Sequence, residues 1–271
     1  MGSSRGYAIV IIIRSGHYAP MFSSDYSCLR LLNFFWLFLF LSRVSASTLI
    51  YSSYLGAEGN DSAVAVTRGP DGAIYILGNT RSSTWLTNST SVLSVNANPE
   101  QGVFIVKLDG TTHGLIYRTA ISGNVEETAL GLTVDSNNRP LIAGTTTSST
   151  LPGIGSIAEA GSNIFLLRLA ADGKTIELGR IFGGAGDDTL TAFNTEASGN
   201  VIIAGKTDSL DFAPTSGTGS LFIARISSAT GAILISDRFG GSSDDLITSI
   251  CASSNNDIIF GGYTDSEDFP A

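Results

Sequence analysis

Four pairs of polar residues, each close to glycines, are the side chains in this sequence whose types and spacing could do chemistry. They are Asn60-Asp61, Glu126-Glu127, Asp187-Asp188 and Asp244-Asp245. Paired carboxylates could bind Ca²⁺, although a calcium site needs six or more oxygen ligands and each pair supplies few. They could also form a catalytic acid pair. We favour a structural interpretation, in which one carboxylate of each pair accepts backbone N–H groups and fixes a turn. We therefore assign no catalytic, cofactor-binding or metal-binding residue.

The other residue types argue against several classes of enzyme. Histidine occurs only at His17 and His113, which is too few for a Ser-His-Asp triad or a histidine metal site. The glycine-rich run from Gly183 to Gly186 leads into acidic residues and a predicted strand rather than a helix N-terminus, so it is a poor phosphate cradle. The sequence gives no reason to expect an enzyme or a cofactor.

The acidic residues belong to a repeat, since each stands 17 residues before a glycine that is followed by threonine at +2 and serine at +4. The columns are Asp61, Glu127, Asp188 and Asp245; Gly78, Gly144, Gly205 and Gly262; Thr80, Thr146, Thr207 and Thr264; and Ser82, Ser148, Ser209 and Ser266. Successive copies begin 66, 61 and 57 residues apart. The variation in length lies after the serine, in polar segments that we predict to be surface loops.

Each copy is predicted to form up to four short strands, two of which precede those loops. The first strands are 63–67, 129–133, 190–194 and 247–251, and the second are 74–77, 141–143, 201–204 and 258–260. The first strand has a small third residue, which indicates a crowded place such as the innermost strand of a radial array. The second is apolar without alternation and should be buried on both faces. The turns between them, Asp71-Gly72, Asn137-Asn138, Ser198-Gly199 and Asn255-Asn256, are rich in residues that tolerate positive φ.

The third strands, 103–108, 164–169 and 221–226, each carry one basic residue among apolar neighbours: Lys107, Arg168 or Arg225. Such a charge is costly unless it is paired. Because the acidic column is the only recurring opposite charge, we predict that some of these cations hydrogen-bond to it. The alternative is that they extend to solvent. The fourth strands, 115–121, 176–182 and 233–239, alternate apolar and polar residues, as expected of an outer strand with one solvent face.

Four-stranded antiparallel units that recur every 57 to 66 residues predict an all-β fold, a β-propeller of four-stranded blades. Residues 49–55 resemble a fourth strand, and the last copy reaches Ala271 after its second strand. We therefore expect about three and a half blades, either a fragment of a longer ring or an open arc. An open arc exposes strand edges, from which we expect self-association.

The repeats also resemble a known family. The run from Tyr51 to Asp61, YSSYLGAEGND, and the third copy, FGGAGDD…GNVIIAGKTDSLDF, are similar to the SBBP repeat, a seven-bladed β-propeller repeat. The second copy departs from the pattern with Ser122-Gly123-Asn124 and Glu127, and the first has Thr84-Trp85-Leu86 in place of Asp-Phe-Pro. The resemblance covers residues 48–271. It implies a propeller in extracellular or envelope proteins and no catalytic activity.

An apolar run from Leu31 to Leu41 precedes the repeats. Its length fits a secretory signal peptide and is short for a membrane span. Small residues at Val44-Ser45-Ala46 predict cleavage near Ala46 or Ser47 and a secreted, extracellular product. The alternative is an uncleaved membrane anchor.

This interpretation divides the chain into a leader, residues 1–47, and a partial propeller, residues 48–271. The long stretch before the apolar run leaves open whether translation starts at Met1 or at Met21.

Composition limits the partners. The net charge is -9, but the leader holds four basic residues and one acidic residue, so residues 48–271 carry a net charge of -12. Such a surface disfavours nucleic acid and anionic lipid. The two cysteines, Cys28 and Cys251, offer no disulfide framework, and Cys251 is predicted to be a buried small hydrophobe. Asn60 and Asn88 match the N-glycosylation sequon, which matters only in a eukaryotic source.

The function that we expect is a secreted or cell-surface binding or scaffold module without catalytic activity, which works through loops at one face of the propeller. Its partner would be an extracellular protein or a glycan, and it would meet a membrane only through an uncleaved leader. One alternative is a carbohydrate-active hydrolase or lyase on the same architecture, which a pocket lined by carboxylates, an arginine and a tyrosine would favour. Another is a Ca²⁺-dependent, adhesin-like module.

Overall fold

Antiparallel β-sheets make up most of the structure, a computed structural model that describes residues 8–15, 47–87, 89–95, 101–157, 161–212, 219–253, 255 and 257–270. The protein is therefore all-β, as the sequence predicts. Two units are distinguished, residues 9–54 and the remainder, and each is described by itself. Among the described residues no helix is long and apolar enough to cross a membrane.

The smaller unit contains a two-stranded sheet of β1 (Ala8–Ser15) and β2 (Ser47–Leu55). The strand predicted at residues 49–55 is thus present. Strand β1 lies within the segment predicted to be a leader. The apolar run from Leu31 to Leu41 lies outside the described residues, so the signal peptide stays a prediction.

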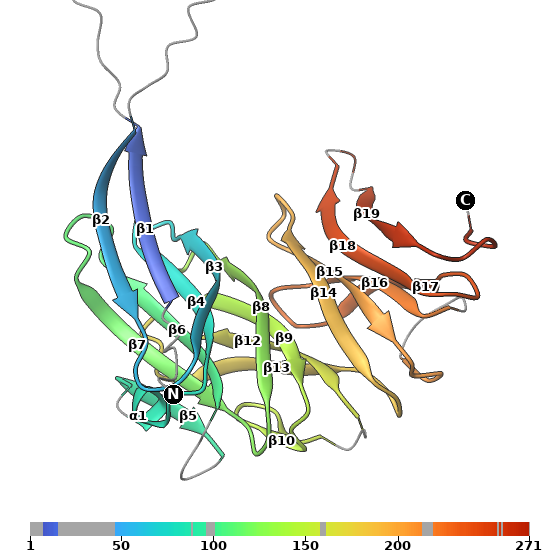
Figure 1. Cartoon of the computed structure of the whole chain (residues 1–271), viewed down its shortest axis with the longest axis horizontal. Helices are drawn as coiled ribbons and strands as arrows, with labels where there is room; N and C mark the ends of the chain where they lie inside the picture. The colour runs from blue at the N-terminus through green and yellow to red at the C-terminus, as the bar shows by residue number, and fades with distance from the viewer. Residues whose placement is uncertain are drawn as a thin grey trace, which may run out of the picture. The chain divides into compact units, whose positions relative to one another are not determined.

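The described part of the larger unit contains four main sheets, in which the strands follow one another in chain order except for β5, and one small two-stranded sheet described below (Figure 1). Sheet 1 consists of β3 (Asp61–Arg68), β4 (Ile74–Thr80), β6 (Gly102–Leu108), β7 (Leu115–Ser122) and β5 (Ser91–Ser94); sheet 2 of β8 (Glu127–Val134), β9 (Pro140–Thr146), β12 (Asn163–Leu169) and β13 (Ile176–Phe182); sheet 3 of β14 (Asp188–Thr195), β15 (Val201–Thr207), β16 (Leu221–Ile226) and β17 (Ile233–Phe239); and sheet 4 of β18 (Asp245–Ala252) and β19 (Ile258–Thr264). Apart from the parallel pair β5–β7, all these strands pair antiparallel. The predicted strands of the four copies are confirmed.

The hairpin turns between first and second strands have the predicted backbone conformation. Gly72, Asn138 and Gly199 have φ values of 81°, 62° and 85°. This left-handed region is accessible to glycine and tolerated by asparagine, so the turn residues set the pairing of each hairpin. Asn256, in the fourth copy, lies outside the described residues.

The first strands of successive sheets contact one another in the order β3, β8, β14, β18. Each contains a β-bulge just before its small third residue, for example between Ala129 and Gly131. A Cβ on Gly131 would lie only 2.2 Å from the ring of Phe193 in sheet 3. The small-residue column is therefore crowded by the next sheet, as predicted, and the bulge adds the local twist that such packing needs.

The second strands β4, β9 and β15 are buried along most of their length, because each sheet packs against its neighbour through both faces of this strand. Strand β19 is the exception and is largely exposed. In the neighbouring strand β18, Cys251 is also exposed, so the prediction that it is a buried small hydrophobe is wrong. The equivalent residues Thr67, Thr133 and Asn194 are polar, so the column indicates a position that tolerates solvent.

Two of the segments predicted to be surface loops contain regular structure. Helix α1 (Ser83–Thr87) and strand β5 follow sheet 1's second strand, and β10 (Thr150–Leu151) pairs with β11 (Gly155–Ser156) after that of sheet 2. Because β5 adds to the edge of β7, the last four residues of β7 are buried and lack the predicted alternation. Polar composition did not reveal this extra pairing.

The glycine column yields a stability prediction. A Cβ on Gly205 would lie 1.9 Å from the Thr189 carbonyl oxygen and 2.7 Å from the Phe222 ring. We expect Gly205→Ala to lower the free energy of unfolding by about 1–3 kcal/mol through overpacking, as measured by urea denaturation. The control is Gly261→Ala, whose Cβ would meet Ser249 Oγ at 3.2 Å and whose equivalent in sheet 3 is already Ala204. An equal loss in both variants would contradict the steric explanation.

Candidate functional site

The carboxylates of the acidic column are buried, and each accepts a backbone N–H from four residues earlier. The donors are Ala57, Gly123, Gly184 and Gly241, at 2.8–2.9 Å from Asp61, Glu127, Asp188 and Asp245 respectively. A hydrogen bond from a backbone N–H to an ionised carboxylate is stronger than one between neutral groups, so each acid stabilises the turn that precedes it. These are the N–H bonds that the structural interpretation of the acidic pairs requires.

The serine column completes the same arrangement. Ser148 Oγ donates to Glu127 Oε1 at 2.6 Å and accepts the N–H of Val125 at 2.8 Å. Equivalent bonds join Ser82, Ser209 and Ser266 to the acid and the turn of their own sheets. We call each set of acid, serine and turn N–H groups a turn network. The hydrogens of these donors point at the oxygen atoms that a cation would need, which disfavours the Ca²⁺ alternative.

The four acids are not brought together, since each lies in the turn network of its own sheet. Their pair-mates make separate contacts: Glu126 pairs with Arg81 at 2.7 Å, Asp244 pairs with Lys206, and Asp187 accepts the N–H of Ser162. Among the described residues, no group of three or more His, Cys, Asp or Glu side chains is placed to hold a metal ion. Each acid of the column is thus bonded within the turn network of its own sheet.

The prediction that the third-strand cations pair with the acidic column is wrong. Lys107 lies opposite Tyr75, five residues along β4 from Thr80, which lies opposite Asp61. At about 3.4 Å per residue this separates the cation from the acid by roughly 17 Å. The cations lie near the hairpin turns, at the other end of each sheet.

Each cation is nevertheless paired, with acids that the column comparison missed. Lys107 Nζ lies 2.7 Å from Asp71, and Arg225 Nε lies 2.6 Å from Glu196. Arg168 Nε lies 3.7 Å from Glu177, and its Nη1 donates to the Ser228 carbonyl at 2.7 Å. These acids do not share one repeat position, so only the register between strands could have revealed them.

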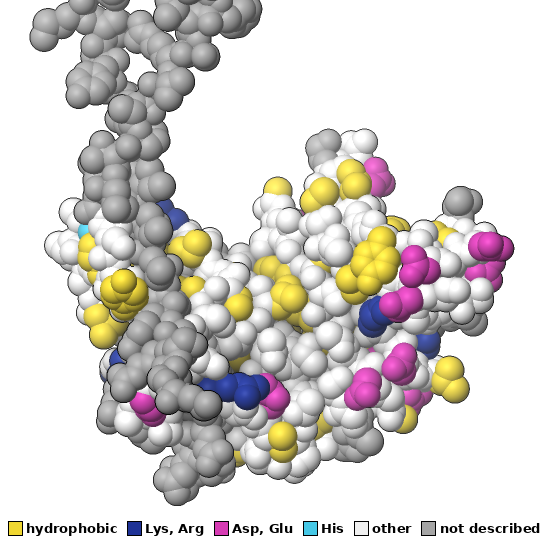
Figure 2. Space-filling model, in the orientation of Figure 1, with side chains coloured by type: hydrophobic (Ala, Val, Ile, Leu, Met, Phe, Trp, Pro, Cys, Tyr) yellow, Lys and Arg dark blue, Asp and Glu magenta, His cyan; other side chains and the backbone are white. Residues whose placement is uncertain are grey.

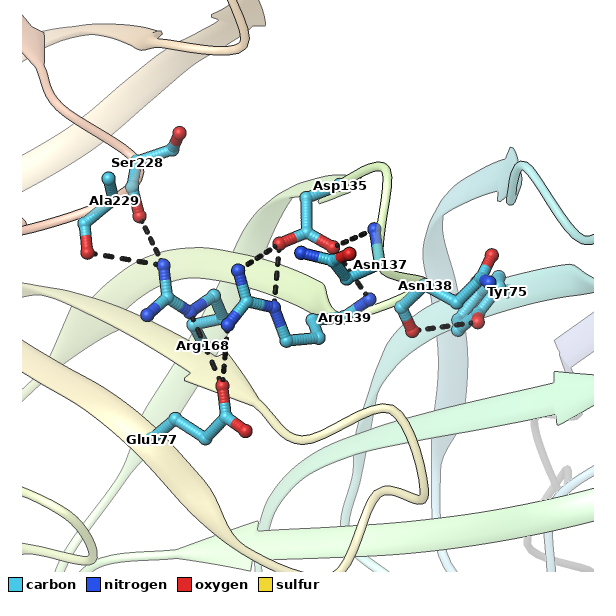
Figure 3. Close-up of polar contacts among 9 residues, drawn as sticks. All are labelled: Tyr75, Asp135, Asn137, Asn138, Arg139, Arg168, Glu177, Ser228 and Ala229. Atoms are coloured by element: carbon cyan, nitrogen blue, oxygen red, sulfur yellow. Dashed lines mark hydrogen bonds and ion pairs between the residues drawn. The ribbon is translucent and has the colours of Figure 1, made fainter.

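A cavity of about 480 Å³ opens beside Arg168 and Glu196, at the hairpin ends of sheets 2 and 3. We call it the hairpin cavity. It is lined by the β8–β9 and β14–β15 hairpins and by Ser228 and Ala229 of the β16–β17 turn. Arg139 bridges Asp135 at 2.7 Å and Glu177 at 3.0 Å, and Arg168 reaches the β16–β17 turn (Figure 3). Charges of both signs are thus held in fixed positions around one opening.

Both partners of the central ion pair are stabilised in their charged forms. Burial raises the pKa of Asp135, but the hydrogen bonds from Arg139 and from the turn N–H groups outweigh it, so this pKa is lowered. The hydrogen bond to Asp135 raises the pKa of Arg139. Asp135 is therefore ionised near neutral pH and is a poor general acid.

Two members of the acidic column are shifted in opposite directions. Burial raises the pKa of Asp188, although its Oδ2 accepts bonds from Ser209 and Gly184. At Asp245 burial also acts upward, but hydrogen bonds from Thr264, the Gly241 N–H and Ser266 outweigh it, and the pKa is lowered. Sheets 2 and 4 flank sheet 3 on both sides, which accounts for the stronger burial effect at Asp188.

This difference predicts opposite pH dependences. The contribution of Asp188 to stability falls as pH rises from the unfolded pKa near 3.8 through its raised folded pKa. The contribution of Asp245 is present above 3.8 and is lost as pH falls through its lowered folded pKa. Relative to the unmodified chain, the free energy of unfolding should rise with pH for Asp188→Asn and fall with pH for Asp245→Asn. Urea denaturation across this acidic range measures both slopes, and slopes of the same sign would contradict the assignment.

Comparison with known proteins adds no family assignment: no family model matches the sequence, and no curated protein matches it.

Proposed function

We propose that this chain is a β-propeller-type binding or scaffold module of the SBBP-repeat kind, with no catalytic activity of its own. Three observations support the propeller: the strand order within each sheet, the contacts between the first strands of successive sheets, and the crowded small-residue column. The recurrence of the turn network in four sheets supports a repeat of one structural unit.

The hairpin cavity is the observation that carries the binding function. Its ion pairs balance in charge, so it presents fixed hydrogen-bond donors and acceptors without a strong field of one sign. None of the described residues that line it is aromatic. Such a surface suits a polar ligand rich in hydroxyl groups, and we propose a short glycan, bound weakly because stacking contacts are missing.

A carbohydrate-active enzyme is the second candidate, because carboxylates and arginines meet in this cavity. A glycosidase needs a carboxylic acid that stays protonated near neutral pH beside an ionised partner. Asp135 has a lowered pKa, Glu196 is paired with Arg225, and no tyrosine is among the described residues of the lining. The site therefore favours binding over hydrolysis.

The proposed binding is tested by filling the cavity without breaking an ion pair. Ala197 lines the cavity and is exposed. Ala197→Trp should therefore block the opening and weaken glycan binding at least about tenfold, which corresponds to about 1.4 kcal/mol of binding free energy. The measurement is a glycan array followed by calorimetry, with and without Ca²⁺. Leu210→Trp, at a residue that is 95% exposed and does not line the cavity, is the matched control. Equal binding by both variants would contradict the site, and glycan cleavage would favour the enzyme.

We also propose that the module works outside the cytoplasm, on the strength of the apolar run from Leu31 to Leu41. Protein recovered from the medium or envelope should begin near Ser47. N-terminal sequencing measures this directly. Recovery of protein with its residues before Leu31 intact would contradict cleavage.

A further inference from the structure

The hairpin ends of sheets 1 and 2 are held together by a tyrosine of the second strand of sheet 1. Tyr75 lies three residues before the column glycine, is fully buried, and packs into an apolar core that it shares with sheet 2. Its hydroxyl donates to the Asn138 carbonyl of the β8–β9 turn at 3.0 Å (Figure 3), and Lys107 Nζ lies 5.0 Å from the centre of its ring. The Asn138 side chain accepts the N–H of Asp71 at 3.0 Å. One ring and one amide thus occupy the space between these hairpins.

The equivalent space between sheets 2 and 3 has different residues. Leu141 takes the place of Tyr75, three residues before the column glycine, and Gly199 takes the place of Asn138, both with left-handed backbone at the turn residue. Leucine lacks the outer ring atoms and the hydroxyl of tyrosine, and glycine lacks the amide. Leu141 and Gly199 both line the hairpin cavity. The cavity therefore lies where the neighbouring pair of sheets has a tyrosine ring and an asparagine side chain.

Leu141 forms the apolar floor of the cavity, since at 2% exposure it is the most buried of the described lining residues. Thr133 and Arg168 lie directly opposite it on β8 and β12, so the three side chains share one face of sheet 2. That face packs against sheet 3, which adds Thr195 and Gly199 to the lining. One apolar contact is thus combined with groups that donate and groups that accept hydrogen bonds.

A ligand group that replaces the missing tyrosine atoms must be small, apolar at one end and able to donate a hydrogen bond. An acetamido group has these properties, because its methyl group is apolar and its N–H donates. It also has as many heavy atoms as a tyrosine side chain has beyond a leucine side chain. A sugar hydroxyl in the same place has no apolar end and leaves part of the space unfilled, which forfeits packing contacts.

The acetamido group is also neutral, which suits the charge of the protein. Residues 48–271 carry a net charge of -12, and acidic side chains gather toward sheets 3 and 4 on the face shown in Figure 2. Such a surface disfavours sugars that carry carboxylate or sulfate groups. Around the cavity itself the charges balance, since Arg139 and Arg168 line it together with Asp135 and Glu196.

We propose that the hairpin cavity recognises N-acetylated amino sugars, an inference that rests on the proposed glycan-binding function and specifies the sugar. The acetamido methyl group packs on Leu141. The acetamido N–H donates to the Gly199 carbonyl, as the Tyr75 hydroxyl donates to the carbonyl of Asn138. The rest of the cavity, which is about 480 Å³ in all, holds the sugar ring.

The probe is chitotriose, titrated into the full chain by calorimetry beside cellotriose, which has hydroxyl groups in place of the acetamido groups. Chitotriose should bind at least about tenfold more tightly. Equal affinity for the two sugars would overturn this inference and leave the glycan site standing, whereas no binding of either sugar would overturn both. Because the protein is the same in both titrations, its folding cannot explain a difference.

Chitin and bacterial cell walls both contain N-acetylated amino sugars, so the repeating disaccharide of peptidoglycan is titrated beside chitobiose. Binding of either disaccharide supports the acetamido contact, and the tighter ligand identifies the source. No binding of either would contradict the contact.

A double variant tests the origin of the cavity. Leu141→Tyr together with Gly199→Asn restores the two residues found between sheets 1 and 2 and should weaken chitotriose binding at least about tenfold. Asparagine tolerates left-handed backbone at residue 199, as Asn138 shows. Leu210→Tyr, at an exposed loop residue outside the cavity lining, should bind as the unmodified chain does. Unchanged affinity in a double variant that unfolds cooperatively in urea would overturn the assignment, and if this variant does not fold, the comparison of the two trisaccharides still decides.

Discussion

A buried carboxylate in each turn network is the interaction on which the sheets depend. An ionised side chain is tolerated in a protein interior only where donors surround it. Here the donors come from the backbone four residues earlier and from a serine 21 residues later, as Gly123 and Ser148 do for Glu127. The network therefore ties the loop that enters a sheet to the end of the second strand. This tie fixes the place where the first strand begins, and in all four sheets that strand begins at the acid.

A second bond between the same two loops shows that the geometry is kept even where the residues change. In sheets 3 and 4 the amides of Ala185 and Ser242 donate to Asp211 and Asp268. In sheets 1 and 2 the direction is reversed, since the amides of Thr84 and Thr150 donate to Glu58 and Asn124. The partners are 26 residues apart in every case. What the sequence shows as a departure from Asp-Phe-Pro is thus an exchange of donor and acceptor, and the apolar residue that follows packs into the sheet either way, as Trp85 and Leu151 do.

Strands and hairpins could be predicted because their signals are local. Positive-φ residues mark the turns, and unbroken apolar runs mark second strands such as Val201–Thr207. The partners of the cations could not be predicted in the same way. Whether Lys107 meets Asp61 or Asp71 depends on the register between strands, and a column comparison assigns no distance along a strand. The prediction that Cys251 is buried was wrong for a related reason. Apolar neighbours within one strand do not reveal whether another sheet covers that face of the strand.

The contacts that join one sheet to the next differ in kind at the two ends. At the turn end, a side chain next to the column glycine accepts a backbone N–H from the next sheet's first strand, as Asn79 does from Ala129 and Thr145 from Leu190. Such neutral bonds are directional and leave little room for adjustment. At the hairpin end, long arginine side chains span from sheet 2 to the β16–β17 turn of sheet 3 and leave the hairpin cavity between them. A ligand there would contact both sheets, so its binding would favour one spacing of the hairpin ends while the turn ends stay fixed. The acidic column therefore fixes the turns within each sheet, whereas at the other end Arg168 of the cation column lines the opening between sheets 2 and 3.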